Sequence, residues 1–398
     1  MNIGEPTTSS PSAISVPIDS LLAKYTHLVL GTGCTVPILH PALPPSKWCI
    51  PALDVVHWYT NHPSQPKAPP IDSVRHISII GQGNVSLDIA RILLSRPEHL
   101  RQYDIPERVL AHLAKSTVKH ISIIGRRGPY EAAFTAKELR ELLDLPNVLM
   151  KSLSPVILQP KDGIKQTRQQ SRIVSLLQRG SKDTPKGPSE DFKHWSLEFF
   201  RSPTGVVPAP RSVHSNLELR LAHTTLDPNN KAVPTGVTST LPTDLIITSL
   251  GHRSEPTTHW YDPGVGHVRN VSGRVGDQRG NLLKNVYTSG WASTGAKGVL
   301  ATTMMDAYNV AQTLLSDARD PVPEARSVMS EDVEAGALDD LPEEVKRGLE
   351  SLRVITHDAW KLVDEEEVRR GAVLGGKERE RMDWNEVHRY LQSIRRVA

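Results

Sequence analysis

The stretch that decides the fold is His76-Ile-Ser-Ile-Ile-Gly-Gln-Gly-Asn-Val-Ser-Leu-Asp-Ile-Ala-Arg-Ile-Leu-Leu94. It begins as a short apolar run that ends at a glycine, and its second half has the spacing of a helix over 85–94. A strand that ends in a glycine turn and leads directly into a helix is typical of a binding site for a dinucleotide pyrophosphate. The alternative is a tight turn that binds no ligand.

Each position of this turn suits a pyrophosphate. Gly81 permits the sharp turn, and Gly83 lets the backbone approach the ligand without a Cβ in the way. The third position must be small so that helix and strand pack closely, and Ser86 occupies it in place of glycine or alanine. The N–H groups at the helix start, together with the helix dipole, would face the anion.

The run His76-Ile-Ser-Ile-Ile80 recurs at 120–124, where it again stops at a glycine, Gly125. Two apolar runs that end at glycine and flank a helical segment indicate neighbouring parallel strands of a βαβ unit. We therefore expect an α/β fold with a Rossmann-like domain. Both histidines precede buried strands, and we interpret them as structural.

The end of the second strand indicates which dinucleotide binds. A site for NAD usually has an acidic residue there, whereas this chain has Arg126-Arg127-Gly128. Two guanidinium groups suit a 2′-phosphate, because arginine pairs with phosphate oxygens in a bidentate fork. The sequence therefore predicts NADP(H), with a solvated basic loop as the alternative. Glu138, on a helix expected over 134–143, either faces the nicotinamide ribose or is an ordinary exposed charge.

A second glycine-rich turn follows a short strand near the C-terminal third. Tyr287-Thr-Ser-Gly290-Trp291 is followed by Lys297-Gly-Val-Leu-Ala-Thr-Thr303, which reads as a strand, a turn and a helix start. The helix start again offers N–H groups to a ligand. Trp291 is placed to cover a flat ring, or it is a core or interface tryptophan.

The composition argues against several classes of protein. The chain has 398 residues and a formal net charge of +3, so we expect no nucleic-acid-binding surface. Cys34 and Cys49 fit neither a zinc site nor a redox pair, which favours a reducing compartment and no metal. No apolar run approaches the roughly 20 residues that cross a bilayer. Glu5 and the absence of Lys and Arg from the first 16 residues predict no targeting peptide in the sequence as written.

The rest of the chain reads less clearly. Proline-rich residues 37–70 predict connecting structure, and the polar, basic residues 155–190 predict a surface excursion. Further strands are expected at 25–30, 195–200, 217–222, 245–250 and 285–288, and further helices at 298–315, 341–353, 364–370 and 384–395.

With these motifs identified, the sequence resembles the adrenodoxin reductase family, the mitochondrial type of ferredoxin–NADP⁺ reductase. The strings that carry the resemblance lie at 79–94, 97–100, 125–129, 133–135, 137–141, 199–203, 233–236, 290–291, 298–303, 360–362 and 377–379. Members are two-domain flavoproteins in which the NADP(H) domain is inserted into a split FAD domain. The resemblance implies a remnant of the FAD domain at 1–40, the NADP(H) domain at 41–255, and the C-terminal part of the FAD domain with a helical tail at 256–398.

The resemblance also implies residue roles. The residues that would meet the pyrophosphate, after the turn residue Gly81, are Gln82, Gly83, Asn84 and Val85. The 2′-phosphate would be held by Arg126 and Arg127, with Glu138 nearby. The residues that would contact the flavin are Ile3, Trp291, Gly298, Val299 and Leu300, and Gly298 would also lie near the nicotinamide. Asp88 would assist proton handling or be a structural aspartate, and we take Asp88 and Glu138 as catalytic candidates.

The chemistry that the resemblance implies is hydride transfer from NADPH to FAD, then single-electron transfers to an acidic [2Fe–2S] ferredoxin. Lys165, Arg168 and Arg172 fall in the stretch that docks this partner in the family, and the alternative is a solvated basic face. The resemblance places the protein in the mitochondrion, peripheral to the matrix side of the inner membrane.

The sequence departs from the family at its start. The family begins with its own FAD-binding strand, glycine turn and helix, whereas Met1-Asn-Ile-Gly4 resembles the interior of that domain. We therefore expect the FAD domain to be incomplete by about 100 residues, and FAD binding to be weak. An alternative hypothesis is a truncated, non-catalytic NADP(H)-binding paralogue or fragment. A pyridine-nucleotide–disulfide reductase is disfavoured because no cysteine pair lies near the flavin-type motifs.

Overall fold

The computed structural model describes residues 2–3, 13–159, 166–182, 192–209, 215–328, 341–352 and 354–395 of the chain. Contacts divide the chain into two compact units. Unit 1 consists of Met1–Ile38, Gly251–Glu365 and Trp384–Ala398, and unit 2 consists of Leu39–Leu250 and Glu366–Asp383.

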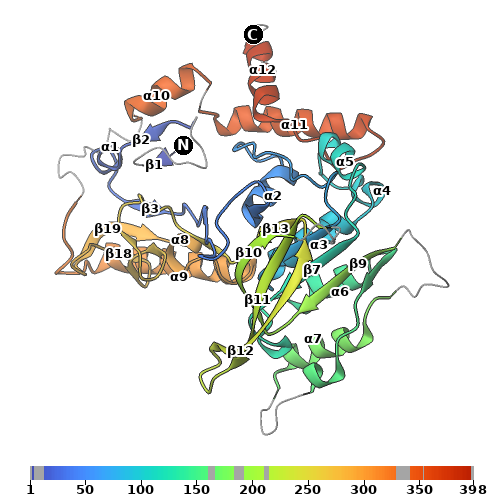
Figure 1. Cartoon of the computed structure of the whole chain (residues 1–398). Helices are drawn as coiled ribbons and strands as arrows, with labels where there is room; N and C mark the ends of the chain where they lie inside the picture. The colour runs from blue at the N-terminus through green and yellow to red at the C-terminus, as the bar shows by residue number, and fades with distance from the viewer. Residues whose placement is uncertain are drawn as a thin grey trace. The chain divides into compact units, whose positions relative to one another are not determined.

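Unit 2 is built on a six-stranded parallel sheet (Figure 1). The strand order is β5 (Cys49–Pro51), β13 (Leu245–Thr248), β6 (His76–Ile80), β7 (His120–Ile124), β9 (Lys193–Glu198) and β8 (Val148–Met150). The two identical runs of the sequence pair in register, with His76 opposite His120 and Ile80 opposite Ile124. The expected α/β class and Rossmann-like sheet are confirmed.

The two faces of this sheet are covered differently. One face packs on the helices α2 (Ala52–Tyr59), α3 (Asn84–Leu94), α6 (Ala136–Leu143) and α7 (Arg168–Arg179). The other face packs on an antiparallel sheet of β10 (Arg201–Pro208), β11 (Leu217–Leu226) and β12 (Ala232–Thr243), drawn in yellow-green in Figure 1. Because both faces are buried, the central strands are nearly continuous apolar runs.

A polar ladder crosses the amino ends of the central strands. The Nε2 atoms of His76 and His120 lie 2.9 and 3.1 Å from the hydroxyl oxygen of Ser122, and the hydroxyl of Ser196 donates to the same oxygen at 3.2 Å. Burial, together with the neighbouring charges of His76 and His194, lowers the pKa of His120 to about 4. The imidazole is therefore neutral near pH 7, which agrees with a structural role.

Unit 1 is built on a smaller sheet. The strand order is β17 (Asn270–Val271), β18 (Arg274–Gly276), β19 (Leu282–Thr288) and β3 (Leu28–Leu30), and β3 is parallel to β19. Its buried core contains Leu30, Val268, Val275, Leu283 and Val286. Short pairs of strands complete it: β1 (Asn2–Ile3) with β2 (Ser15–Val16), β4 (Val36–Pro37) with β14 (His252–Arg253), and β15 (Tyr261–Asp262) with β16 (His267–Val268).

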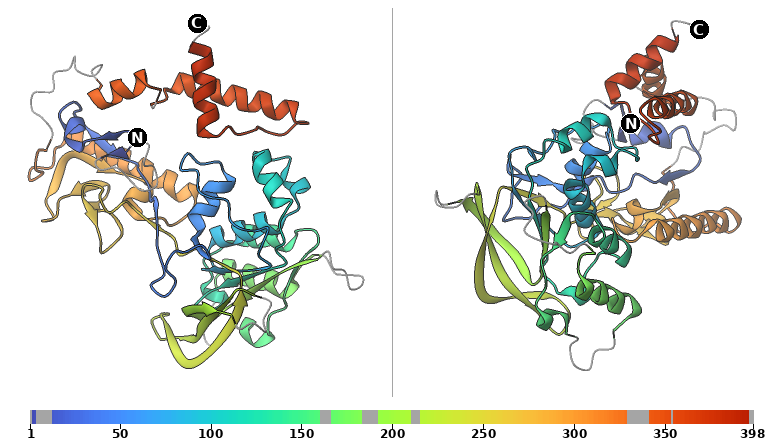
Figure 2. Two further views of the ribbon diagram at one scale, coloured as in Figure 1. Left: turned by 45° about the horizontal axis from the view of Figure 1, so that its top comes forward. Right: turned by 90° about the vertical axis from the view of Figure 1, so that its right-hand side faces the viewer.

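The helices of unit 1 include one long helix, α9 (Leu300–Arg319), which is drawn in orange in Figure 2 and contacts β19. The others are α1 (Ile18–Leu22), α8 (Trp291–Thr294), α10 (Glu343–Glu350) and α12 (Trp384–Arg395). Within the described ranges α9 buries only Val310, and it exposes the apolar side chains of Leu300, Met304, Met305 and Tyr308. Helix α11 (His357–Val373) contributes residues to both units.

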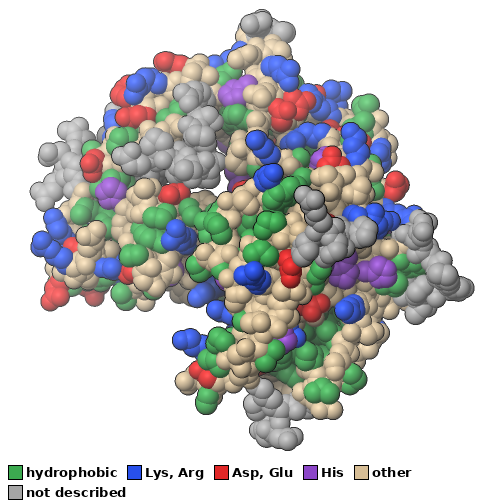
Figure 3. All heavy atoms as spheres, viewed as in Figure 1, with side chains coloured by type: hydrophobic (Ala, Val, Ile, Leu, Met, Phe, Trp, Pro, Cys, Tyr) green, Lys and Arg blue, Asp and Glu red, His purple; other side chains and the backbone are tan. Residues whose placement is uncertain are grey.

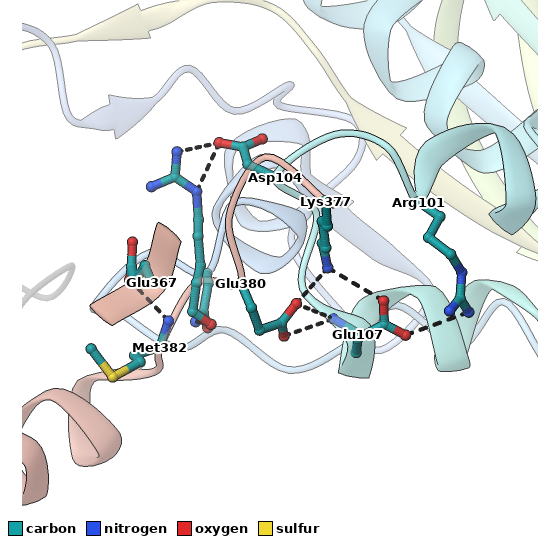
Figure 4. A network of polar contacts seen from close by, with 9 residues as sticks. Arg101, Asp104, Glu107, Glu367, Lys377, Glu380 and Met382 are labelled. Carbon is teal, nitrogen blue, oxygen red and sulfur yellow. Dashed lines mark hydrogen bonds and ion pairs between the residues drawn. The ribbon is translucent and has the colours of Figure 1, made fainter. Parts of the chain in front are cut away.

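The segment Glu366–Asp383 belongs to unit 2, although the sequence analysis left it with the C-terminal part of the FAD domain. A network of polar contacts holds it beside α4 (Pro97–Leu100) and α5 (Glu107–Leu113) (Figure 4). The Lys377 side chain is 0% exposed, and its ammonium pairs with the carboxylates of Glu107 and Glu380. Glu380 also accepts a hydrogen bond of 2.9 Å from the backbone amide of Glu107, at the first residue of α5.

Three expectations about local structure were wrong. Residues 37–70 contain β5 and the helix α2, whose Val55 and Trp58 are buried in the core. The expected surface excursion at 155–190 contains α7, which packs Ile173 and Leu177 into the same core. The sequence did not predict this helix because its narrow apolar stripe lies among many polar and basic residues. The strand expected over 25–30 is confined to Leu28–Leu30, since Tyr25 closes the turn after α1 by donating to Leu21 O.

Candidate functional site

The glycine turn lies at the carboxyl end of β6, between β7 and β13. The amide of Gly81 donates to Ile124 O at 2.8 Å, and the amide of Ser249 donates to Ile80 O at 2.7 Å. Gly81 has a φ of 121°, and a Cβ there would come within 2.1 Å of Ser249 O. Only glycine fits this position, because both the left-handed backbone and the neighbouring strand exclude a side chain.

The next residues direct their side chains inward. Gln82 donates to Ile123 O at 3.1 Å, Asn84 accepts from the amide of Thr135 at 2.8 Å, and Val85 packs against the core. Gly83 is the N-cap of α3, and nothing lies within 4 Å of the position that a Cβ would occupy. Among the described residues, no side chain caps this helix. The backbone at the start of α3 therefore faces an open space, as a pyrophosphate would require.

Two buried oxygens near this turn have no hydrogen-bond partner among the described residues: Ser86 Oγ and Glu138 Oε2. Ser86 is 0% exposed on α3. Its buried hydroxyl, without a partner in the described part of the chain, lowers the stability of the fold relative to an alanine or glycine at this position. Glu138 lies in the first turn of α6, three residues after the Thr135 that bonds Asn84. Because this oxygen is shielded from solvent, a ligand hydroxyl would reach it after a rotation of the Glu138 side chain.

The backbone of the turn after β7 is held by hydrogen bonds from other segments, and the side chains of its two arginines are exposed to solvent. Thr224 donates through its hydroxyl to Arg126 O at 2.7 Å, and the amide of Phe200 donates to Arg127 O at 3.2 Å. A Cβ on Gly128 would come within 2.4 Å of the Phe200 ring, so a larger residue there would force that ring to shift. Both arginine side chains are exposed on this anchored turn. The sequence analysis missed Thr224, whose place on β11 no local motif reveals.

His40 is a further residue that the sequence analysis missed. Burial and the nearby positive charge of Arg126 lower the pKa of its imidazole. Its Nδ1 atom accepts a hydrogen bond of 3.2 Å from the amide of Ala42. A neutral histidine therefore lies near one of the two candidate phosphate ligands, in a proline-rich stretch that gave no functional signal.

Asp88 lies on α3 in an ion-pair network with α6. Its carboxylate is 3.0 Å from Arg91, and Arg91 also pairs with Glu141 at 2.7 Å. Burial raises the pKa of Asp88, the Arg91 guanidinium opposes that shift, and the charges of Glu138 and Glu141 add to it. The network joins the two helices that carry the candidate residues.

The second glycine-rich turn, which the sequence predicts to hold the flavin ring, lies in unit 1. Gly290 precedes α8, and Gly298 is crowded by Thr302 Oγ1, which would lie 2.3 Å from a Cβ. Trp291, the first residue of α8, is 40% exposed, and Val299 and Leu300 at the start of α9 are 50% and 87% exposed. Exposed apolar side chains next to a helix N-terminus fit a flat ring with a polar edge.

The remaining predicted residues lie elsewhere. Arg168 and Arg172 are exposed one turn apart on α7, opposite the buried Ile173 and Leu177. Lys165 lies outside the described residues. Ile3 belongs to β1 and pairs with Val16 in unit 1.

Other features bear on the remaining predictions. In the described part of the chain, no His, Cys, Asp or Glu side chains gather in a group of three or more that could hold a metal ion. Cys34 and Cys49 are buried and unpaired with each other. None of the described helices has both the length and the apolar character needed to cross a bilayer. The face seen in Figure 3 mixes basic and acidic side chains, in keeping with the net charge of +3.

Comparison with known proteins identifies the family. No protein-family model matches the chain. It is 37% identical to the human mitochondrial NADPH:adrenodoxin oxidoreductase over 355 residues, which cover 84% of this chain and 68% of that protein. It is 33% identical to NADPH-ferredoxin reductase FprA of Mycobacterium tuberculosis over 278 residues, covering 67% of this chain and 58% of that one. The solved structure of Mycobacterium tuberculosis FprA in complex with NADPH superimposes with a TM-score of 0.76 at 27% identity, over 95% of this chain and 81% of that one. The chain therefore belongs to the NADPH:adrenodoxin oxidoreductase family.

Proposed function

We propose that this protein is an NADPH:adrenodoxin (ferredoxin) oxidoreductase that uses FAD. The observation that carries the proposal is the anchored Arg126-Arg127 turn beside the open glycine turn at Gly81 and Gly83. A 2′-phosphate is bound by positively charged side chains, and a pyrophosphate is bound by accessible backbone N–H groups. Unit 2 has both, at the ends of the neighbouring strands β7 and β6. A bound flavin would supply the chemistry that this activity needs, which is acceptance of a hydride from NADPH and release of single electrons to an iron–sulfur protein.

The residues of unit 2 would bind and orient the nucleotide. The backbone of Gln82, Gly83, Asn84 and Val85 would face the pyrophosphate, and Arg126 and Arg127 would read the 2′-phosphate. Glu138, with its unsatisfied Oε2, would accept a hydrogen bond from a ribose hydroxyl. We further propose that Asp88 holds or releases a proton, which its burial-raised pKa favours, although the Arg91 ion pair opposes it.

The residues of unit 1 would hold the flavin ring. Trp291, Val299 and Leu300 would cover it, and the Gly298 turn would bring backbone close to its edge. Ile3 would add a minor contact.

The partner is an iron–sulfur ferredoxin, and we propose that it is an acidic [2Fe–2S] protein that docks on the exposed Arg168 and Arg172 of α7. Charge complementarity would raise the association rate more than the final affinity. The human relative is mitochondrial by name. We propose the same compartment here, on the matrix side of the inner membrane.

The test is NADPH-dependent reduction of a [2Fe–2S] ferredoxin by the purified chain supplemented with FAD, followed by visible absorbance. Reduction with NADPH and much slower reduction with NADH are expected. Reversal of Arg168 and Arg172 to Glu should slow the reaction at low salt, and the difference should shrink as salt screens the charges. Binding of NADPH without any ferredoxin reduction at saturating FAD would instead favour the non-catalytic paralogue.

A further inference from the structure

One carboxylate joins the two pieces of chain that form the proposed flavin site. Asp306 lies on α9, six residues after Leu300 and so about 9 Å along the helix axis. Its Oδ2 atom accepts a hydrogen bond of 2.7 Å from the backbone amide of Gly290 and one of 3.1 Å from the Ser289 hydroxyl. The hydroxyl of Ser293 lies 3.3 Å from the same oxygen.

These donors all belong to the turn that presents Trp291. Gly290 has a φ of 67°, a conformation that glycine adopts easily, and its amide points at the helix rather than into the short helix α8. The single hydrogen of the Ser293 hydroxyl is shared with Gly290 O, which lies 3.1 Å away. Hydrogen bonds to a charged acceptor are among the stronger ones in proteins, so the Gly290 amide and the Ser289 hydroxyl together form a firm anchor.

The opposite side of α8 is also held. The Cys34 thiol donates to Trp291 O at 3.2 Å, and the Asn270 side-chain amide donates to Ser293 O at 2.8 Å. The carbonyl side of the Trp291 turn is therefore tied to the rest of unit 1. Within the described part of the chain, Asp306 is the residue of α9 that accepts hydrogen bonds from Ser289 and Gly290.

We infer that Asp306 is a positioning residue that fixes the Trp291 ring relative to Val299 and Leu300 at the start of α9. This inference rests on the proposed function, because it takes those three side chains as the seat of the flavin ring. Asp306 itself needs no contact with the cofactor. Its oxygen sets the distance between the turn and the helix, and so the width of the space that the ring would enter.

The test compares three variants in the full-length chain. Asp306→Ala removes the acceptor, whereas Asp306→Asn keeps an oxygen in the same place without its charge. Asp317→Asn is the matched control, since Asp317 is another half-buried carboxylate of α9, paired with Arg274 at 2.6 Å and bonded by the Tyr287 hydroxyl at 3.1 Å. FAD binding is followed by quenching of flavin fluorescence, and hydrogen exchange is measured on a peptide that contains the Gly290 amide.

Asp306→Ala is expected to weaken FAD binding about tenfold and to speed exchange of the Gly290 amide, as the loss of a charged hydrogen-bond acceptor would. Asp306→Asn, which keeps an acceptor without its charge, should lie between Asp306→Ala and the wild type in both measurements, and Asp317→Asn should change neither. Unchanged FAD affinity in Asp306→Ala, no rescue in Asp306→Asn, or an equal loss in Asp317→Asn would each overturn the inference. Absence of FAD binding in the wild type would refute the proposed function instead, and Gly290 exchange would then decide alone whether Asp306 fixes the turn.

Discussion

The side-chain oxygen of Asn84 accepts a hydrogen bond of 2.8 Å from the backbone amide of Thr135. This contact joins the first residue of α3 to the N-cap of α6, so the glycine turn and the helix that carries Glu138 form one rigid corner. Asn84 is also one of the residues predicted to meet the pyrophosphate, and its side-chain oxygen is already bonded by the Thr135 amide. Its backbone amide remains the group available to a ligand.

Gly81 and Gly83 are expected to fail in different ways when changed to alanine. Gly83→Ala meets no atom within 4 Å and keeps an ordinary backbone, with a φ of −106°, so the protein should fold normally. Its methyl group would stand where the pyrophosphate approaches, and NADPH binding should weaken about tenfold or more. Gly81→Ala would instead strain the backbone against Ser249 O and lower the free energy of unfolding by about 2–4 kcal/mol.

Isothermal titration with NADPH and thermal unfolding separate the two effects. A Gly83→Ala protein that binds NADPH as tightly as the wild type would remove the pyrophosphate from this turn.

Ser86 and Ser122 provide a matched pair of buried hydroxyls. Ser86 Oγ has no partner among the described residues, so Ser86→Ala should raise the free energy of unfolding by about 1 kcal/mol and leave NADPH affinity unchanged. Ser122 Oγ joins His76, His120 and Ser196, so Ser122→Ala should lower it by about 1–3 kcal/mol.

Urea denaturation measures both changes. Equal destabilisation by the two substitutions would show that Ser86 has a partner that the contacts do not reveal.

Lys377 should be essential to the docking of the segment Glu366–Asp383 on unit 2 (Figure 4). Lys377→Met would leave Glu107 and Glu380 close together without their shared cation, and should lower the free energy of unfolding by about 3 kcal/mol. The control is Lys346→Met, because Lys346 pairs with Glu343 at 2.8 Å on an exposed surface and should change stability by at most about 0.5 kcal/mol.

Limited proteolysis gives a second measurement of this docking. Cleavage within 366–383 should become faster only in Lys377→Met. Equal protection in both variants would mean that the ion pairs do not hold the segment.

The sequence predicted the central strands and the glycine turn well because each is encoded locally. The runs at 76–80 and 120–124 are apolar, short and ended by glycine, and they pair in register as expected. The helix expected over 85–94 begins one residue earlier and ends at the same residue. This region could be predicted because the strand, turn and helix signals in its sequence all agree with one structure.

Features that depend on distant contacts were not predictable. Nothing near Thr224 or Asp306 in the sequence shows that one anchors Arg126 and the other anchors Gly290. Strand β12 contains Pro, Gly and several Thr, and it is ordered by pairing with β11 rather than by its own pattern. Helix α7 was missed because its few apolar residues are buried by packing against distant parts of the chain, and the local composition gives no sign of those contacts.

The most direct test of the account is the selectivity of the nucleotide site. Arg126 and Arg127 lie on a turn whose backbone is held by Thr224 and Phe200, so changing both arginines to alanine should leave the turn intact. The loss of two charge-assisted contacts predicts NADPH binding weaker by about 100-fold and NADH binding within about threefold of the wild type. Titration of the double variant with each nucleotide decides the matter, and equal losses for NADPH and NADH would contradict the assignment of the 2′-phosphate to this turn.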